Sequence, residues 1–153
     1  MTRRQLLTYL GTLAGVAIGG RLAGAQGQAK TPIAVYKDPL CGCCGKWVEH
    51  MQANGFAPTV TVTDMPPIRA KYKVANTVAS CHTSVIGGYV IEGHVPASDV
   101  RLLLTRKPKG IVGITIPGMP PSAPGMDMQP FQPYTVLTFD EKGATTVFMK
   151  HTK

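Results

Sequence analysis

Short apolar runs predict the strands in the first two thirds of the chain. Residues 33–36 are apolar with β-branched and aromatic members, which indicates a buried strand. Residues 59–63 alternate threonine and valine at period two and predict a second strand. Residues 84–93 contain two more short strands joined at the glycine pair Gly87-Gly88, the pattern of a tight hairpin.

Helical periodicity fills the segments between these strands. We predict a first helix over 44–54, capped by Gly55, and a short second helix over 68–72 that follows two prolines. Residues 95–99 open a third helix, with Pro96 suited to its first turn and Asp99 placed to interact favourably with its dipole. The apolar positions at helical spacing are Trp47, Val48 and Met51 in the first helix and Val100, Leu103 and Leu104 in the third. Trp47 is therefore expected in the core.

The composition shifts to proline, glycine and methionine from Lys107 onward. Residues 118–130 cannot form a regular helix or a central strand, so we predict an exposed loop there. Two strand-like segments, 134–139 and 144–149, follow this loop and predict a closing hairpin.

The order of these elements is strand, helix, strand, helix, strand, strand, helix. Three of the four cysteines lie in the turn after the first strand, where Cys41 and Cys44 form the C-x-x-C spacing of thioredoxin-like proteins. Residues 36–44 and the hairpin at 86–93 resemble their glutaredoxin counterparts. We therefore predict an α/β, thioredoxin-like (glutaredoxin-like) three-layer sandwich with a C-terminal Pro/Met-rich loop and β-hairpin extension. In that fold the loop before the third strand, which here carries Cys81-His82, lies against the C-x-x-C turn.

The first 25 residues have the pattern of an export signal. A paired arginine at positions 3 and 4, sixteen uncharged residues at 5–20 and the A-x-A sequence at 23–25 resemble a twin-arginine signal with its cleavage site. A retained membrane anchor is the alternative, but this glycine-containing stretch is shorter than the ~20 apolar residues that span a bilayer. We predict cleavage near Gln26, a periplasmic location, no stable membrane span after cleavage, and one domain over residues 26–153.

The positive net charge of the chain suggests nucleic-acid binding, but the positions of the basic residues along the sequence disfavour it. The formal net charge is +8, but three of the sixteen basic residues lie in the signal-like segment. Without them thirteen basic residues face eight acidic ones, a net charge of +5 with no dense basic block. Binding through phosphate contacts requires a clustered basic face, so we expect no nucleic-acid partner.

The cysteines allow three kinds of chemistry. Two structural disulfides are one alternative in an exported protein, but bridges among Cys41, Cys43 and Cys44 would close very small loops and restrict the unfolded chain little. The C-x-x-C pair alone fits either a redox site or soft-metal ligands. Cys43 adds a thiol that would compete in disulfide exchange, and His82 stands about where thioredoxin-like oxidoreductases carry a cis-proline. A metal site formed by Cys41, Cys43, Cys44, Cys81 and His82 therefore becomes the favoured interpretation.

Four motifs resemble the exported bacterial proteins of domain-of-unknown-function family 411. These motifs are Tyr-Lys-Asp-Pro-x-Cys-Gly-Cys-Cys-x-x-Trp-Val at 36–48, Ser-Cys-His-Thr at 80–83, Gly-Tyr-x-Ile-Glu-Gly-His-Val-Pro-Ala at 88–97, and the pair Pro-Gly-Met-Pro and Pro-Gly-Met-Asp at 117–127. The resemblance covers residues 33–128. It implies a metal-binding protein associated with copper resistance.

The remaining candidate ligands favour copper over zinc. Thiolates with an imidazole suit Cu(I) or Zn²⁺, whereas the thioethers of Met119, Met126 and Met128 suit Cu(I). The alternative is that these methionines anchor a loop on the core. We expect His50 and His94 to be surface or capping residues, with His94 also a candidate for the shell around the ligands because it lies in a family motif.

We thus expect an exported Cu(I)-binding protein for copper buffering, delivery or resistance, with a copper-handling protein as its partner. A thiol–disulfide oxidoreductase using Cys41 as nucleophile and Cys44 as resolving thiol is the alternative, and a structural module with two disulfides is a third. The eight acidic residues show no paired-carboxylate pattern, and the sequence contains no P-loop. A shared site requires the sulfurs of Cys44 and Cys81 to lie within about 8 Å of each other, roughly twice the span of a metal with ~2.3 Å thiolate bonds.

Overall fold

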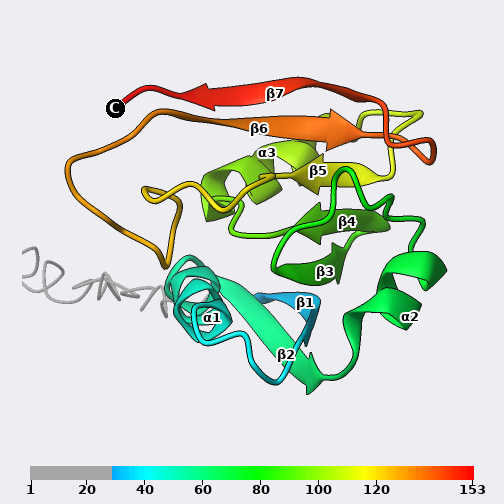
Figure 1. Ribbon diagram of the computed structural model, residues 1–153, viewed down its shortest axis with the longest axis horizontal. Coiled ribbons are helices and arrows are strands. Elements are labelled where there is room, and N and C mark those ends of the chain that lie inside the picture. The colour runs from blue at the N-terminus through cyan, green and yellow to red at the C-terminus, as the bar shows by residue number, and fades with distance from the viewer. Residues whose placement is uncertain (1–28) are drawn as a thin grey trace, which may run out of the picture.

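The computed structural model describes residues 29–153, which form a mixed α/β fold around one seven-stranded sheet (Figure 1). The signal-like segment 1–25 lies outside the described residues. The elements in chain order are β1 (Thr31–Lys37), α1 (Cys44–Ala53), β2 (Phe56–Val62), α2 (Met65–Lys71), β3 (His82–Ile86), β4 (Tyr89–Glu92), α3 (Ala97–Arg106), β5 (Gly113–Thr115), β6 (Tyr134–Phe139) and β7 (Thr145–His151). The order expected for the first seven elements is confirmed.

The strands follow the sheet order β2-β1-β3-β4-β5-β6-β7. The pairs β1/β2 and β4/β5 are parallel, and the other neighbours are antiparallel. Strand β2 and strand β7 therefore form the two edges, which lie at opposite ends of the sheet in Figure 1. The hairpin β3–β4 turns at Gly87-Gly88, both with positive φ, as the glycine pair predicted.

Apolar side chains cover both faces of the sheet. The larger cluster includes Trp47 of α1 and Val100 of α3, whereas Val74 and Val78, which follow α2, belong to a second cluster. In β4, Ile91 contributes to the first cluster and its neighbour Val90 to the second. Because successive strand residues point to opposite faces, α1 and α3 cover one face and the segment after α2 covers the other.

The predicted core position of Trp47 is confirmed. Its side chain is fully buried, and its indole nitrogen donates a hydrogen bond to the carbonyl of Val95 at 2.9 Å. This bond ties α1 to the segment that enters α3, so it helps to fix the two helices relative to each other on the same face of the sheet. His94 lies in the same segment and is close to Cys44 and Cys81, so the start of α3 is near the cysteine turn.

Strand β5 was not expected from the sequence. It has three residues, all buried, and it joins the C-terminal hairpin to β4, so that the hairpin continues the main sheet. Gly113 pairs with Val90, and the carbonyl of Val90 occupies the space that a Cβ at position 113 would need. Three residues that include a glycine are too few to show a strand period.

The description of residues 118–130 as an exposed loop is wrong for its centre. Ala123 is fully buried and Gly125 is also buried, whereas residues 127–130 are exposed. A Cβ at Gly125 would lie 2.8 Å from the backbone nitrogen of Trp47, so the loop packs directly on α1. The Pro- and Gly-rich composition correctly excluded regular structure, but it could not report this long-range contact.

Candidate metal centre

A tight turn between β1 and α1 presents the first three cysteines. The carboxylate of Asp38 accepts the Leu40 N–H at 2.8 Å, and the Cys41 N–H bonds to the Asp38 carbonyl at 3.1 Å. Lys37 donates to the Cys41 carbonyl at 3.2 Å. Cys44 is then the first residue of α1 and is fully buried, whereas Cys41 is half-buried. The sharp reversal explains how three closely spaced cysteines can converge on one place.

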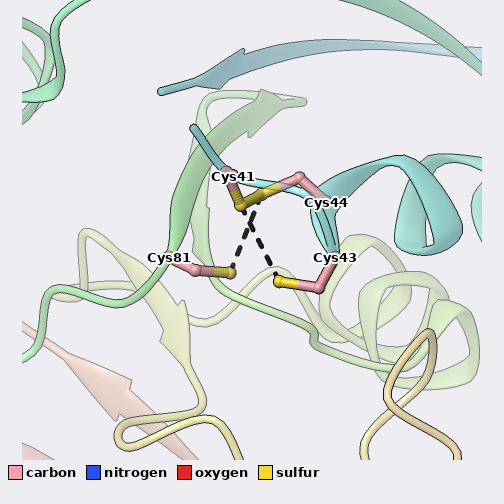
Figure 2. A group of neighbouring side chains, drawn as sticks. All are labelled: Cys41, Cys43, Cys44 and Cys81. Carbon is pink, nitrogen blue, oxygen red and sulfur yellow. Dashed lines mark hydrogen bonds between the residues drawn. A yellow bond between two sulfur atoms is a disulfide. The ribbon is translucent and has the colours of Figure 1, made fainter. Parts of the chain in front are cut away.

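The four cysteine sulfurs form one cluster (Figure 2). All four Sγ atoms lie within 4.8 Å of one another, with 3.8 Å between Cys41 and Cys43 and 4.0 Å between Cys44 and Cys81. Cys81 reaches the turn from the loop before β3, as the predicted fold requires. The expected proximity of Cys44 and Cys81 is therefore confirmed, and their role as metal ligands stays a prediction.

Cys41 and Cys44 are joined by a disulfide bond, and Cys43 and Cys81 are free thiols. In this oxidised form only two of the four sulfurs can become thiolates. Reduction of the bond by two electrons would release two more thiols into the same cluster. The four clustered sulfurs are thus the ligand type of a soft-metal site, whereas the Cys41–Cys44 disulfide is typical of a redox pair.

Burial, with smaller effects from the neighbouring Cys43 thiol, raises the pKa of the Cys81 thiol to about 12. Without a metal, Cys81 is therefore protonated and a weak nucleophile at neutral pH. A bound metal ion would displace this proton, because thiolates rather than thiols are the ligands.

His82 is fully buried beneath the cysteines at the start of β3. Its Nδ1 lies 3.3 Å from the Cys81 sulfur, and its ring packs against Trp47 with centroids 4.4 Å apart. Burial, with smaller effects from His94 and Lys37, lowers the pKa of His82 to about 3. The ring is thus neutral at physiological pH, and its Nε2 has no hydrogen-bond partner among the described residues.

His94 belongs to the same site, which sequence reasoning largely missed. The expectation of a surface residue is wrong, because His94 is only 1% exposed and its ring lies 5.3 Å from that of His82. Its Nδ1 lies 2.8 Å from the Pro124 carbonyl, which can only accept, so Nδ1 carries the proton. The Nε2 lone pair is consequently free, buried and without a partner in residues 29–153. Burial also lowers the pKa of His94.

These histidines extend the cluster inward. Cys44, Cys81, His82 and His94 place four donor atoms within 4.8 Å of one another, sharing two sulfurs with the cysteine cluster. The hydrogen bond from His94 to Pro124 has the form of the second-sphere contacts that orient metal-binding imidazoles. The only sequence signal for His94 was its place in the family motif at 88–97. His50, by contrast, is half-buried and accepts the Ala97 N–H at 3.1 Å, so it caps the first turn of α3.

The predicted methionine ligands lie in the loop that packs over this site. The loop contacts it through the Pro124 carbonyl and through Gly125, which lies against α1. Met119 and Met126 are half-buried, whereas the Met128 side chain is 55% exposed. Their role as ligands stays a prediction.

Within residues 29–153 no helix has both the length and the apolar character needed to cross a membrane.

Comparison with known proteins gives two kinds of match. The family model "Protein of unknown function, DUF411" matches residues 78–126, which include Cys81, His82, His94 and most of the methionine loop. Two solved structures of "Copper resistance protein copG", Form 1 and Form 2, are similar at 39% and 38% identity, each with a TM-score of 0.73. Each match covers 80% of this chain, and 98% and 99% of those chains. No curated protein matches the chain.

Proposed function

The chain belongs to the DUF411 family and is a relative of the copper resistance protein copG, and from this membership we propose that it binds copper as Cu(I) through its cysteine cluster. Its role would be to buffer or deliver copper, or to give resistance to it, outside the cytoplasm. The copper ion is the cargo of this protein and passes to or from a copper-handling partner.

One observation carries the proposal: four cysteine sulfurs from two distant segments lie within 4.8 Å of one another. Three of them come from the β1–α1 turn, and Cys81 comes from 37 residues further along the chain than Cys44. Soft thiolate ligands favour Cu(I) and zinc among common metals. The family relation to a copper resistance protein, and the methionines of the loop at 118–130, favour copper.

The surroundings of the cluster support a ligand role for imidazole as well. His82 and His94 are buried and neutral, and each has a nitrogen without a hydrogen-bond partner among the described residues. Leaving a buried polar atom unpaired costs about 1–3 kcal/mol, which a bound metal ion would offset. Met119, Met126 and Met128 remain candidate thioether ligands from the loop at 118–130.

We also infer a thioredoxin-like fold for a mature domain that starts near residue 26. The order β2-β1-β3-β4, with β1 and β2 parallel and β3 antiparallel to both neighbours, supports this. Helices α1 and α3 cover one face, and the C-x-x-C turn is at the start of α1. A twin-arginine-like signal at 1–25 supports export to the periplasm.

Binding by all four thiols requires reduction of the Cys41–Cys44 disulfide. We therefore expect two loading states, with strong Cu(I) binding by the reduced protein and weak binding by the oxidised one. The test is an anaerobic titration in which the protein competes with a chromogenic Cu(I) chelator. The oxidised wild type, with Cys43 and Cys81 as its free thiols, is the matched control. Equal affinity in both states, or no competition in either, would refute the four-thiol site.

A second function, thiol–disulfide exchange, is favoured by one specific observation: Cys41 and Cys44 are already paired. Cys41 is the more accessible of the two, so it would be the nucleophile, and the buried Cys44 would resolve the mixed disulfide. In the reductase direction, the Cys41 thiolate attacks a substrate disulfide and one substrate thiolate leaves. Cys44 then attacks Cys41, which releases the second substrate thiol and restores the disulfide. Insulin reduction by metal-free protein with a dithiol reductant measures this activity.

A further inference from the structure

Glu92, at the end of β4, is an acidic residue with no exposed surface. Burying a carboxylate is costly, and a well-packed apolar residue would stabilise the sheet at least as well. The metal site proposed above does not use Glu92 as a ligand. Its contacts therefore have to explain its presence.

The Glu92 carboxylate bonds to residues on both sides of Cys81-His82. One oxygen accepts the Ser80 backbone N–H at 2.9 Å, and the other accepts the Thr83 hydroxyl. Strand pairing places Thr83 directly opposite Glu92. One buried side chain thus spans the turn from which Cys81 reaches the cluster.

Arg69 of α2 fixes the other side of the same turn. Its guanidinium donates to the Ser80 carbonyl, and its Nε lies 4.0 Å from the Glu92 carboxylate. Both backbone polar groups of Ser80 are therefore held by ionisable side chains, the N–H by Glu92 and the carbonyl by Arg69. Gly93 completes the arrangement, because a Cβ at this position would collide with the Ser80 side chain.

The consequence concerns the position of Cys81. Its sulfur lies 4.0 Å from that of Cys44, although the two residues belong to different elements. A displacement of the turn would separate them, because no covalent bond joins these segments near the site. We propose that Glu92, assisted by Arg69, is a positioning residue that holds Cys81 against Cys44.

Measuring the effect of Glu92 on copper binding rests on the proposed function. The primary test of its positioning role therefore uses no copper. In a Cys41→Ser, Cys43→Ser background, Cys44 and Cys81 remain as a single pair of thiols. Diamide oxidises this pair to a disulfide: the two thiols lose two electrons and two protons, and diamide becomes the hydrazine. The rate of closure reports how closely the sulfurs are held.

Two substitutions at position 92 separate positioning from charge. Glu92→Gln can still accept the Ser80 N–H through its carbonyl and donate to the Thr83 hydroxyl, so we expect closure at the parent rate. Glu92→Ala removes both bonds, and we expect closure to slow at least about tenfold, the scale of lost second-sphere contacts at metal sites. With all four cysteines present, Cu(I) affinity should fall by a similar factor in Glu92→Ala and be retained in Glu92→Gln.

Unchanged closure in Glu92→Ala, even with a lower melting temperature, would make Glu92 merely structural and overturn the proposal. If Glu92→Ala does not fold, Thr83→Val removes one of the two bonds and should slow closure about threefold, whereas an unchanged rate again overturns it. If closure slows as expected but no variant binds copper, the positioning role of Glu92 stands and the proposed function fails.

Discussion

The buried carboxylate of Glu92 should make the stability of the protein depend on pH in a defined direction. Burial raises its pKa from 4.5 to about 7, despite the opposing effects of Thr83, Ser80 and Arg69. The native state therefore binds more protons than the unfolded state between these two pH values. It follows that the contribution of Glu92 to stability is largest below about pH 4.5 and is lost as the pH rises through 7.

The size of the effect follows from the shift. Raising the pKa from 4.5 to about 7, at ~1.36 kcal/mol per pH unit, gives about 3 kcal/mol between the two limits, most of it between pH 5 and pH 8. Because the side chain has no exposed surface, screening by solvent does not reduce this value substantially. Glu92→Gln keeps the shape and the hydrogen bonds but cannot titrate.

The assay is urea unfolding of the reduced, metal-free wild type and Glu92→Gln at a series of pH values from 5 to 8. Other titrating groups, His82 and His94 among them, contribute to both proteins and cancel in the difference. We expect the free energy of unfolding of the wild type to fall relative to the variant by about 2–3 kcal/mol across this range. Parallel profiles, or a difference of opposite sign, would refute a buried carboxyl with a raised pKa.

Three further predictions concern the site and the sheet. Cys81→Ser should weaken Cu(I) binding at least about tenfold while changing the melting temperature little, because Cys81 is a free thiol; a variant that melts several degrees lower yet keeps full affinity would give Cys81 a structural role. Metal-free, reduced wild type should show weak insulin reductase activity and His82→Pro a gain, with poorer copper binding in the variant; wild-type turnover comparable to a glutaredoxin would favour the oxidoreductase alternative. Gly113→Ala should destabilise the fold by about 3 kcal/mol in denaturant unfolding, because Val90 occupies the space for the new methyl group; unchanged stability would contradict the close pairing of β4 and β5.

Much of the architecture could be predicted because its signals are local. Apolar runs, helical spacing and the glycine pair at 87–88 identified the first seven elements in order, and the convergence of Cys81 on the cysteine turn followed from that order. Strand β5 could not be predicted in the same way. Its pairing depends on a contact between Gly113 and a strand more than twenty residues away, which leaves no periodic pattern in the sequence.

The inner part of the site was harder to predict for a related reason. His94 is buried because the loop at 118–130 folds back over it, and proline- and glycine-rich composition indicates irregular structure without indicating where the loop packs. Glu92 is a single acidic residue in a strand, and its partners come from α2 and from the turn at residues 80–83. The spacing of the cysteines likewise permitted several pairings, of which the structure contains Cys41–Cys44.

The central claim is that copper is held by the sulfurs of the cysteine cluster. X-ray absorption at the copper edge, on reduced protein loaded anaerobically with Cu(I), observes those neighbours directly. The account predicts Cu(I) surrounded mainly by sulfur, with sulfur neighbours lost in the Cys44→Ser and Cys81→Ser variants. Copper surrounded only by nitrogen and oxygen, or a spectrum that neither substitution changes, would contradict it.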